Sequence, residues 1–187
     1  MINIIIHDKY KLLQLIGKSN MSEVFLALNL QNSQKVVVKK ILYTADQNIP
    51  ILRFKREVEA LSNITHPHIV KIEEFFQDSN AYYIIMEYYE GDVLRKIIPK
   101  LSIMEKIKVI IKITDALCYI HSRNIIHRDL KPENILVKRG EDIDVRLVDF
   151  GMAYFLDYRD IFKKGSIVGT LAYLSSEQTG IWNREID

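Results

Sequence analysis

The chain of 187 residues has a single cysteine, no long apolar run and almost no excess of one charge. Cys118 alone can form neither an internal disulfide nor a cysteine-rich zinc site, so we expect a reducing, cytoplasmic compartment. No run approaches the roughly 18 apolar residues that a membrane span needs. Residues 1–8 also lack the basic lead and the cleavage site of a signal peptide. We therefore expect no membrane association and no export.

Charge and composition place the chain among ordinary globular proteins. Its 26 basic and 24 acidic side chains leave a net charge of +2, which argues against a nucleic-acid partner held by phosphate contacts. Hydrophobic residues make up 48% of the chain and charged residues 27%, so a packed core is expected rather than disorder. The length fits one domain, with at most a second one begun.

The first half of the chain has the pattern of a sheet. Residues 10–16, 24–29 and 35–41 are apolar, rich in β-branched side chains and separated by turn residues, which predicts three strands. A helix is expected after Pro50, because apolar residues recur at helical spacing at 54, 58 and 61. Two further strands are predicted at 69–77 and 81–88, joined by a turn of Asp, Ser and Asn.

The second half begins with a long helix. Ser102 and Glu105 have the spacing of a capping box, which predicts a helix that starts there and runs to about His121. An apolar stripe predicts its buried face. The stripe consists of Ile103, Ile107, Ile110, Ile111, Thr114, Leu117 and Cys118. Short strands are expected at 135–138 and 144–148.

The strongest motif lies at 127–134, which reads His-Arg-Asp-Leu-Lys-Pro-Glu-Asn, and Asp-Phe-Gly follows at 149–151. In this order and spacing, the two motifs resemble the catalytic loop and the metal-binding motif of eukaryotic-type Ser/Thr protein kinases, in particular bacterial members. The resemblance covers residues 10–187. It implies an α+β, bilobal protein-kinase-like fold with an antiparallel sheet and one helix at 1–86, a hinge at 87–91, and a partial, mainly helical lobe at 92–187 that ends with the activation segment.

The resemblance also assigns roles to the motif residues. Asp149 and Asn134 carry hard oxygen ligands of the kind that Mg²⁺ prefers, with Mn²⁺ as an alternative ion, and would hold the metal beside ATP. Asp129 would accept the proton of the incoming hydroxyl. Lys131 resembles the lysine of the Ser/Thr-selective subgroup, which contacts the transferred phosphate. Protein Ser/Thr hydroxyls are therefore the expected phosphoryl acceptors.

A lysine–glutamate pair is the second signal. The period of two along the strand at 35–41 places Val37, Lys39 and Ile41 on one face, with Lys40 on the other. Glu57 falls inside the apolar stripe of the predicted helix, where a carboxylate needs a partner. By resemblance, Lys39 contacts the α- and β-phosphates of ATP and pairs with Glu57. The alternative for Glu57 is a solvated charge at the edge of the helix stripe.

The loop that covers the phosphates departs from the family pattern. The pattern is Gly-x-Gly-x-x-Gly-x-Val, and this chain keeps Gly17 and Val24 but has Ser19 and Ser22 in place of two glycines. Glycine permits close backbone approach and positive φ, so the two serines predict a stiffer loop or weaker nucleotide binding. A P-loop is excluded, because Leu12 stands where its first glycine is required.

Other residues match the adenine pocket of the family, as apolar walls or as hinge residues whose backbone bonds the base edge. Each of them is also compatible with a plain core role. They are Val24, Val37, Met86, Glu87, Tyr89 and Leu136.

Two residues match positions that control kinase activity. Arg128 precedes Asp129, as in kinases whose arginine pairs with an activation-loop phosphate, and Ser166 lies at the place of the family's primary phosphosite. We therefore expect phosphorylation of Ser166 to order the loop.

Three interpretations remain open on the sequence alone. The leading one is an ATP-dependent protein kinase that phosphorylates Ser/Thr hydroxyls. The alternatives are a catalytically impaired nucleotide-binding or regulatory fragment of a larger multidomain kinase, and an unfolded remnant. The chain ends at Asp187, before the later helices of the family, so we expect further C-terminal domains or a completing chain. One apolar face of the helix at 102–121 would otherwise stay uncovered.

Overall fold

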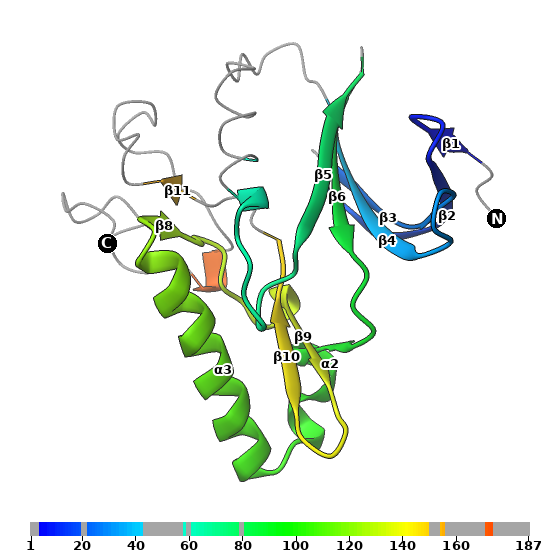
Figure 1. Cartoon of the computed structure of the whole chain (residues 1–187). Coiled ribbons are helices and arrows are strands. Elements are labelled where there is room, and N and C mark those ends of the chain that lie inside the picture. Colours follow the sequence, from blue (N-terminus) through cyan, green and yellow to red (C-terminus); the bar gives the residue numbers. More distant parts are fainter. Residues whose placement is uncertain are drawn as a thin grey trace. The chain divides into compact units, whose positions relative to one another are not determined.

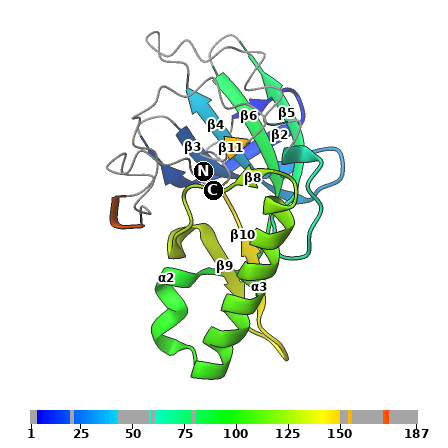
Figure 2. The ribbon, with the colours of Figure 1, turned by 90° about the vertical axis from the view of Figure 1, so that its left-hand side faces the viewer.

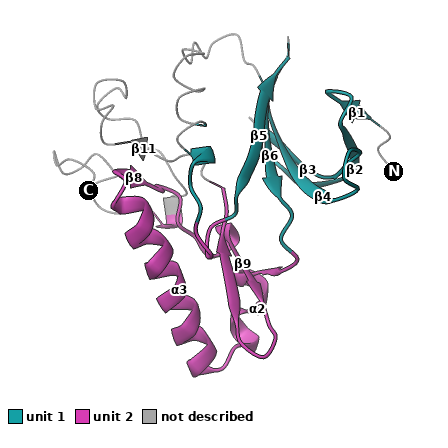
Figure 3. Ribbon diagram, viewed as in Figure 1, with its two compact units in different colours: residues 1–65, 70–89 teal, residues 66–69, 90–187 magenta. Residues whose placement is uncertain are grey.

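The computed structural model describes residues 4–19, 22–42, 58, 61–78, 81–149, 154–155 and 171–173 (Figure 1). The chain divides into two compact units, coloured separately in Figure 3. Unit 1 comprises residues 1–65 and 70–89, and unit 2 comprises residues 66–69 and 90–187. The short segment 66–69 therefore belongs to unit 2, although the residues on both sides of it in sequence belong to unit 1.

Unit 1 is built on a six-stranded antiparallel sheet in the order β1-β2-β3-β4-β6-β5. Its strands are β1 (Ile5–Ile6), β2 (Tyr10–Lys18), β3 (Ser22–Asn29), β4 (Lys35–Leu42), β5 (Ile72–Gln77) and β6 (Ala81–Glu87). The predicted strands are confirmed, with ends that differ by three residues or fewer. The strand expected at 69–77 begins at Ile72, because Ile69 instead forms a parallel bridge with Leu147 in unit 2.

The core of unit 1 lies on one face of this sheet. Alternation along each strand brings the apolar side chains of that face together. They are Tyr10, Leu12, Phe25, Ala27, Val36, Val38, Ala81, Tyr83 and Ile85. On β4, Val37 and Lys39 therefore lie on the face opposite the buried Val36 and Val38, as the period of two predicts. The predicted helix after Pro50 falls mostly outside the described residues, although Val58 and Leu61 are helical and buried.

Unit 2 combines helices with two small antiparallel sheets. The helical elements are α2 (Leu94–Ile97), η1 (Ile98–Lys100), α3 (Ile103–His121), η2 (Pro132–Asn134) and η4 (Leu171–Tyr173). The strands are β7 (Asp92–Val93), β8 (Ile125–Ile126), β9 (Ile135–Lys138), β10 (Asp144–Leu147) and β11 (Tyr154–Phe155), ordered β10-β9-β7 and β11-β8. The strands predicted at 135–138 and 144–148 are thus present, the second ending one residue early. Helix α3 runs beside β10 (Figures 1 and 2).

The start of α3 confirms the predicted capping box. The Ser102 hydroxyl accepts a hydrogen bond from the Glu105 amide at 3.2 Å, and the Glu105 carboxylate accepts one from the Ser102 amide at 2.8 Å. These bonds satisfy amide groups that a helix start leaves without partners in the helix. Among the helices that the structure describes, none is both long and apolar enough to cross a bilayer.

The predicted buried face of α3 is wrong. Ile103, Ile107, Ile110, Ile111, Thr114 and Cys118 are exposed, and Leu117 is half-buried. The residues that α3 buries are instead Val109, Ala116 and Ile120. The physical reason is that α3 is apolar on several sides, and the side that packs is the one facing β10. The exposure of the other stripe agrees with the expectation that one apolar face of this helix stays uncovered.

Candidate active site

The segment between β8 and β9 holds Asp129 in a network of hydrogen bonds. The Asp129 side chain is buried, with 9% of the residue exposed. Its Oδ2 atom accepts from Lys131 Nζ at 2.7 Å and from Asn134 Nδ2 at 3.0 Å. Asn134 Nδ2 also donates to the Asp129 carbonyl at 2.9 Å. A buried carboxylate requires such partners, so the lysine and the amide together hold Asp129 in place as a charged group.

His127 joins this loop to the segment that leads to Asp149. The imidazole is 2% exposed. Its Nδ1 atom accepts from the Asp129 amide at 3.3 Å, so Nε2 carries the proton and donates to the Val148 carbonyl at 3.2 Å. Burial lowers the pKa of His127, and the opposing effects of the Val148 carbonyl, Asp149 and Asp129 are smaller. His127 is therefore a neutral, packed residue.

Asn134 and Asp149 provide oxygen atoms suited to a metal. The Val148 amide donates to the Asn134 carbonyl at 2.9 Å, which ties the residue before Asp149 to Asn134. Because Asn134 Nδ2 is used by Asp129, the remaining amide atom, Oδ1, is the one that suits a cation. An amide oxygen and a carboxylate are a donor set that Mg²⁺ accepts. Within the described residues, no cluster of three or more His, Cys, Asp or Glu side chains forms a metal site.

Backbone strain marks both ends of this site. Arg128 and Asp149 each have a φ of 64°, in the left-handed region that residues other than glycine rarely adopt. Such a conformation costs on the order of 1–3 kcal/mol and persists only where the surroundings enforce it. In this chain it turns the backbone immediately before Asp129 and at Asp149. The Arg128 side chain is half-buried.

In unit 1, strand pairing brings several predicted nucleotide-binding residues together. Lys39 on β4 lies opposite Val24 on β3 and Ile84 on β6, and Val37 lies opposite Met86. All of these except Ile84 are half-buried on their strands. The face of the sheet that carries Lys39 therefore combines a cation with apolar side chains.

The other residues predicted for the adenine pocket lie in two places. Glu87 and Tyr89 lie at and just after the end of β6, and Leu136 lies in unit 2. The Glu87 amide donates to the Lys71 carbonyl at 3.0 Å, so only the Glu87 carbonyl could serve a base edge. Tyr89, the last residue of unit 1, is half-buried. Leu136 belongs to unit 2, where it lies half-buried between Val93 and Arg146 in the sheet of β7, β9 and β10.

The loop between β2 and β3 differs from a glycine-rich loop in its bonding. Gly17 pairs with Val24, and a Cβ atom added at Gly17 would meet Val24 at 3.5 Å, an ordinary contact. Ser19 and Ser22 hydrogen-bond to each other across the loop. Glu57, Phe150 and Ser166 lie outside the described residues, so the Lys39–Glu57 pair and the phosphosite stay predictions.

One contact near the catalytic loop has no counterpart in the sequence predictions. Arg95 on α2 lies 3.7 Å from the Glu133 carboxylate and donates to the Tyr173 hydroxyl at 3.1 Å. It thereby connects η2, which ends at Asn134, with η4. No sequence signal identifies Arg95, because its partners lie 38 and 78 residues further along the chain.

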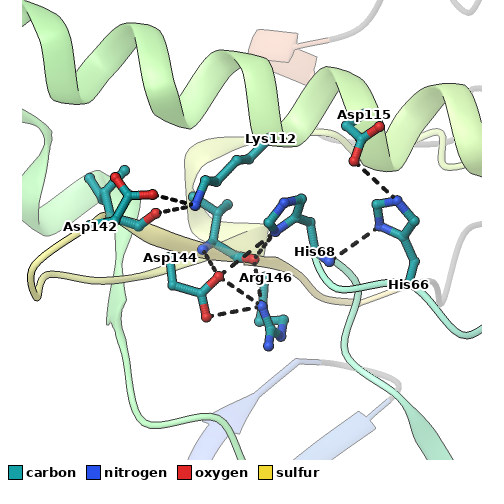
Figure 4. A network of polar contacts seen from close by, with 9 residues as sticks. His66, His68, Lys112, Asp115, Asp142, Asp144 and Arg146 are labelled. Atoms are coloured by element: carbon teal, nitrogen blue, oxygen red, sulfur yellow. Dashed lines mark hydrogen bonds and ion pairs between the residues drawn. The ribbon is translucent and has the colours of Figure 1, made fainter.

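A second polar network connects segment 66–69 with α3 and β10 within unit 2 (Figure 4). His66 Nε2 lies 3.3 Å from the Asp115 carboxylate on α3, and His66 Nδ1 accepts from the His68 amide at 3.2 Å. His68 Nδ1 lies 3.2 Å from the Val145 carbonyl on β10. Burial lowers the pKa of His66, and the opposing effect of Asp115 is smaller. Both histidines of this segment thus contact elements of the unit 2 core.

We expect acid to destabilise the chain through His66 and His127. Burial lowers the pKa of both below the value of about 6.5 for an exposed histidine, so the unfolded chain takes up protons first. Their contribution is complete above about pH 6.5 and is lost as the pH falls toward the lower folded pKa values. Urea unfolding at about pH 7.5 and pH 5.5 measures the loss. His66→Gln should weaken this pH dependence, whereas the same change at the exposed His121 should leave it intact. If both variants lost the same free energy of unfolding between the two pH values, the role of His66 would be contradicted.

Comparison with known proteins shows the family of this chain. Residues 10–185 match the protein kinase domain family. The chain therefore belongs to the protein kinase family. It is 34% identical to the serine/threonine-protein kinase PknD of Protochlamydia amoebophila, over 91% of this chain and 21% of that protein. It is 36% identical to the serine/threonine-protein kinase PrkC of Bacillus subtilis, over 92% of this chain and 27% of that protein.

Similarity also extends beyond bacteria. The calcium-dependent protein kinase 4 of Plasmodium berghei is 32% identical over 94% of this chain and 34% of that protein. The chain thus spans about a fifth to a third of the length of these relatives. The predicted kinase family and the fold of an antiparallel sheet followed by a helical part are confirmed.

Proposed function

We propose that this chain carries the catalytic apparatus of a protein kinase, which transfers the γ-phosphoryl group of Mg·ATP to Ser/Thr hydroxyls of proteins. The observation that carries the proposal is the buried Asp129, whose Oδ2 atom accepts hydrogen bonds from both Lys131 and Asn134. A carboxylate held in this way is charged and oriented, as a group that accepts a hydroxyl proton must be. The names of the bacterial relatives support Ser/Thr as acceptors.

The other residues have complementary parts in this proposal. Phosphoryl transfer depends mainly on positioning and on stabilisation of negative charge. Lys39 would contact the α- and β-phosphates. Lys131 would contact the transferred phosphoryl group once its hydrogen bond to Asp129 breaks. Asn134 and Asp149 would hold Mg²⁺ or Mn²⁺ through oxygen atoms, and the ion would neutralise phosphate charge.

The remaining residues concern adenine binding and control. Val24, Val37, Met86 and Leu136 would form apolar walls for the base, with Glu87 and Tyr89 as hinge residues. Arg128 and Ser166 would serve regulation by phosphorylation. Cytoplasmic location is proposed from the single cysteine, and further domains from the greater length of the relatives.

The proposed nucleotide contact can be tested with two adjacent lysines of β4. We expect Lys39→Met to abolish both phosphoryl transfer and stabilisation by Mg·ATP, because it removes the cation beside the phosphates. Lys40→Met is the matched control, since Lys40 lies on the other face of the same strand. A ligand at a hundredfold excess over Kd stabilises the folded state by about 2.7 kcal/mol, which a thermal melt detects.

The transfer assay uses γ-labelled ATP, Mg²⁺ and a serine- and threonine-rich protein such as casein. Label on serine or threonine that disappears on chelation of Mg²⁺ supports the proposal. Stabilisation by Mg·ATP with no transfer would instead support the regulatory, nucleotide-binding alternative. Equal loss in Lys39→Met and Lys40→Met would contradict the role of Lys39.

A further inference from the structure

The two serines that replace glycines in the loop between β2 and β3 close the loop on itself. The Ser19 amide donates to the Ser22 carbonyl at 2.8 Å, and the Ser22 amide donates to Ser19 Oγ at 3.1 Å. The two hydroxyl oxygens lie 3.0 Å apart. We call this pair of residues the serine clasp. Asn20 and Met21, between the two serines, lie outside the described residues.

Strands β2 and β3, which flank the serine clasp in sequence, are paired directly beside it. Lys18 lies opposite Glu23 and forms an ion pair with it at 3.0 Å, and Gly17 lies opposite Val24. Neither serine has a positive φ. The clasp is therefore the regular end of a β-ribbon, with side-chain hydroxyls added to the backbone bonds.

The hydroxyl of Ser19 changes what this loop can offer to a ligand. Backbone amides at a tight turn are the groups that bind phosphate oxygens, and in this family the loop covers the phosphates of ATP. The Ser22 amide already donates to Ser19 Oγ. Glycine at position 19 could not supply such an acceptor, since it has no side chain. A phosphate that uses the Ser22 amide must therefore displace the hydroxyl.

We propose that Ser19 sets the affinity of this chain for the phosphate part of the nucleotide, because its hydroxyl competes with the phosphates for the Ser22 amide. This inference rests on the proposed function, since it requires that ATP binds beneath the loop. It predicts that the clasp weakens binding of ATP but not of the nucleoside. Ser22 takes part in the competing hydrogen bond through its backbone amide. The Ser22 hydroxyl contacts the Ser19 hydroxyl but is not part of that bond.

The test compares Kd values of Mg·ATP and adenosine, measured by isothermal titration calorimetry on the full chain. Ser19→Ala and Ser19→Gly both remove the acceptor, so each should tighten Mg·ATP by about two- to tenfold, the equivalent of one hydrogen bond. Adenosine, which has no phosphate, should keep its Kd.

Ser33→Gly is the matched control for the gain of a glycine. Ser33 is exposed, has a φ of 58° and lies in the turn between β3 and β4 of the same sheet, so its replacement should leave both Kd values unchanged. A tighter Kd in Ser19→Gly but not in Ser19→Ala would assign the effect to backbone freedom and overturn the inference. So would an unchanged or weaker Mg·ATP affinity in both Ser19 variants. If the parent chain bound neither ligand, the proposed function would fail as well.

Discussion

Replacement of Asp129 by Asn is expected to lower kcat for phosphoryl transfer by about 10²–10⁴-fold, the usual contribution of a positioned proton acceptor. The amide has the shape of the carboxylate but neither its charge nor its basicity. It also places an NH₂ group where Lys131 and Asn134 now donate to a carboxylate. One of the two donors would therefore lose its acceptor or the amide would have to turn.

The control for this variant is the same change at Asp142. This exposed carboxylate accepts from Lys108 at 2.7 Å and from Lys112 at 3.1 Å, and these bonds hold its pKa well below the usual range. It lies in the turn between β9 and β10, outside the catalytic loop. Asp142→Asn should keep kcat near the parent value. Steady-state kinetics with Mg·ATP measures both variants, and a kcat loss under about tenfold in Asp129→Asn would refute the role of Asp129.

Truncation of Ile120 to Ala is expected to lower the free energy of unfolding by about 2–5 kcal/mol, the range for a large aliphatic side chain removed from a packed core. Ile120 is fully buried, with 0% of the residue exposed, near the end of α3. Its removal leaves a cavity that the surrounding side chains fill only in part. The loss is a large share of the total stability of an ordinary domain.

Ile110 on the same helix provides the matched comparison. It is 62% exposed, so Ile110→Ala should change stability by no more than about 0.5 kcal/mol. The two variants have the same change of side chain on the same helix and differ only in burial. Urea unfolding followed by circular dichroism measures both. Equal losses would show that the exposed stripe is covered in solution, and would contradict the packing of α3.

Much of the fold can be predicted from sequence because its signals are local. The strands β2, β3 and β4 follow from apolar runs rich in β-branched residues between turns, and the start of α3 follows from the capping-box spacing of Ser102 and Glu105. The catalytic loop is a contiguous motif, so its residues Asp129, Lys131 and Asn134 can be identified by their order and spacing alone. In each case the residues that interact lie within a few positions of one another or follow a simple period.

The hydrogen bonds that particular side chains form could not be predicted in this way, whether their partners are near or far along the chain. Sequence alone assigns Lys131 to the phosphate, whereas in the structure its Nζ atom donates to the same oxygen of Asp129 as Asn134 does. The mutual bonding of Ser19 and Ser22 is likewise visible only once the strands that carry them pair. The position of Arg95 between Glu133 and Tyr173 depends on three segments far apart in the chain.

Helix α3 shows the division most clearly. Residues 102–121 specify a helix and its first turn, because capping and helical hydrogen bonds join neighbours in sequence. They do not specify its buried side, because isoleucines occur on several sides and capping and helical hydrogen bonds do not distinguish between these sides. That choice depends on β10, which α3 contacts and which lies more than twenty residues further along the chain. In the folded chain Val109, Ala116 and Ile120 are buried, while Ile103 stays 75% exposed. Burial is a property of two surfaces in contact, and one helix supplies only the first of them.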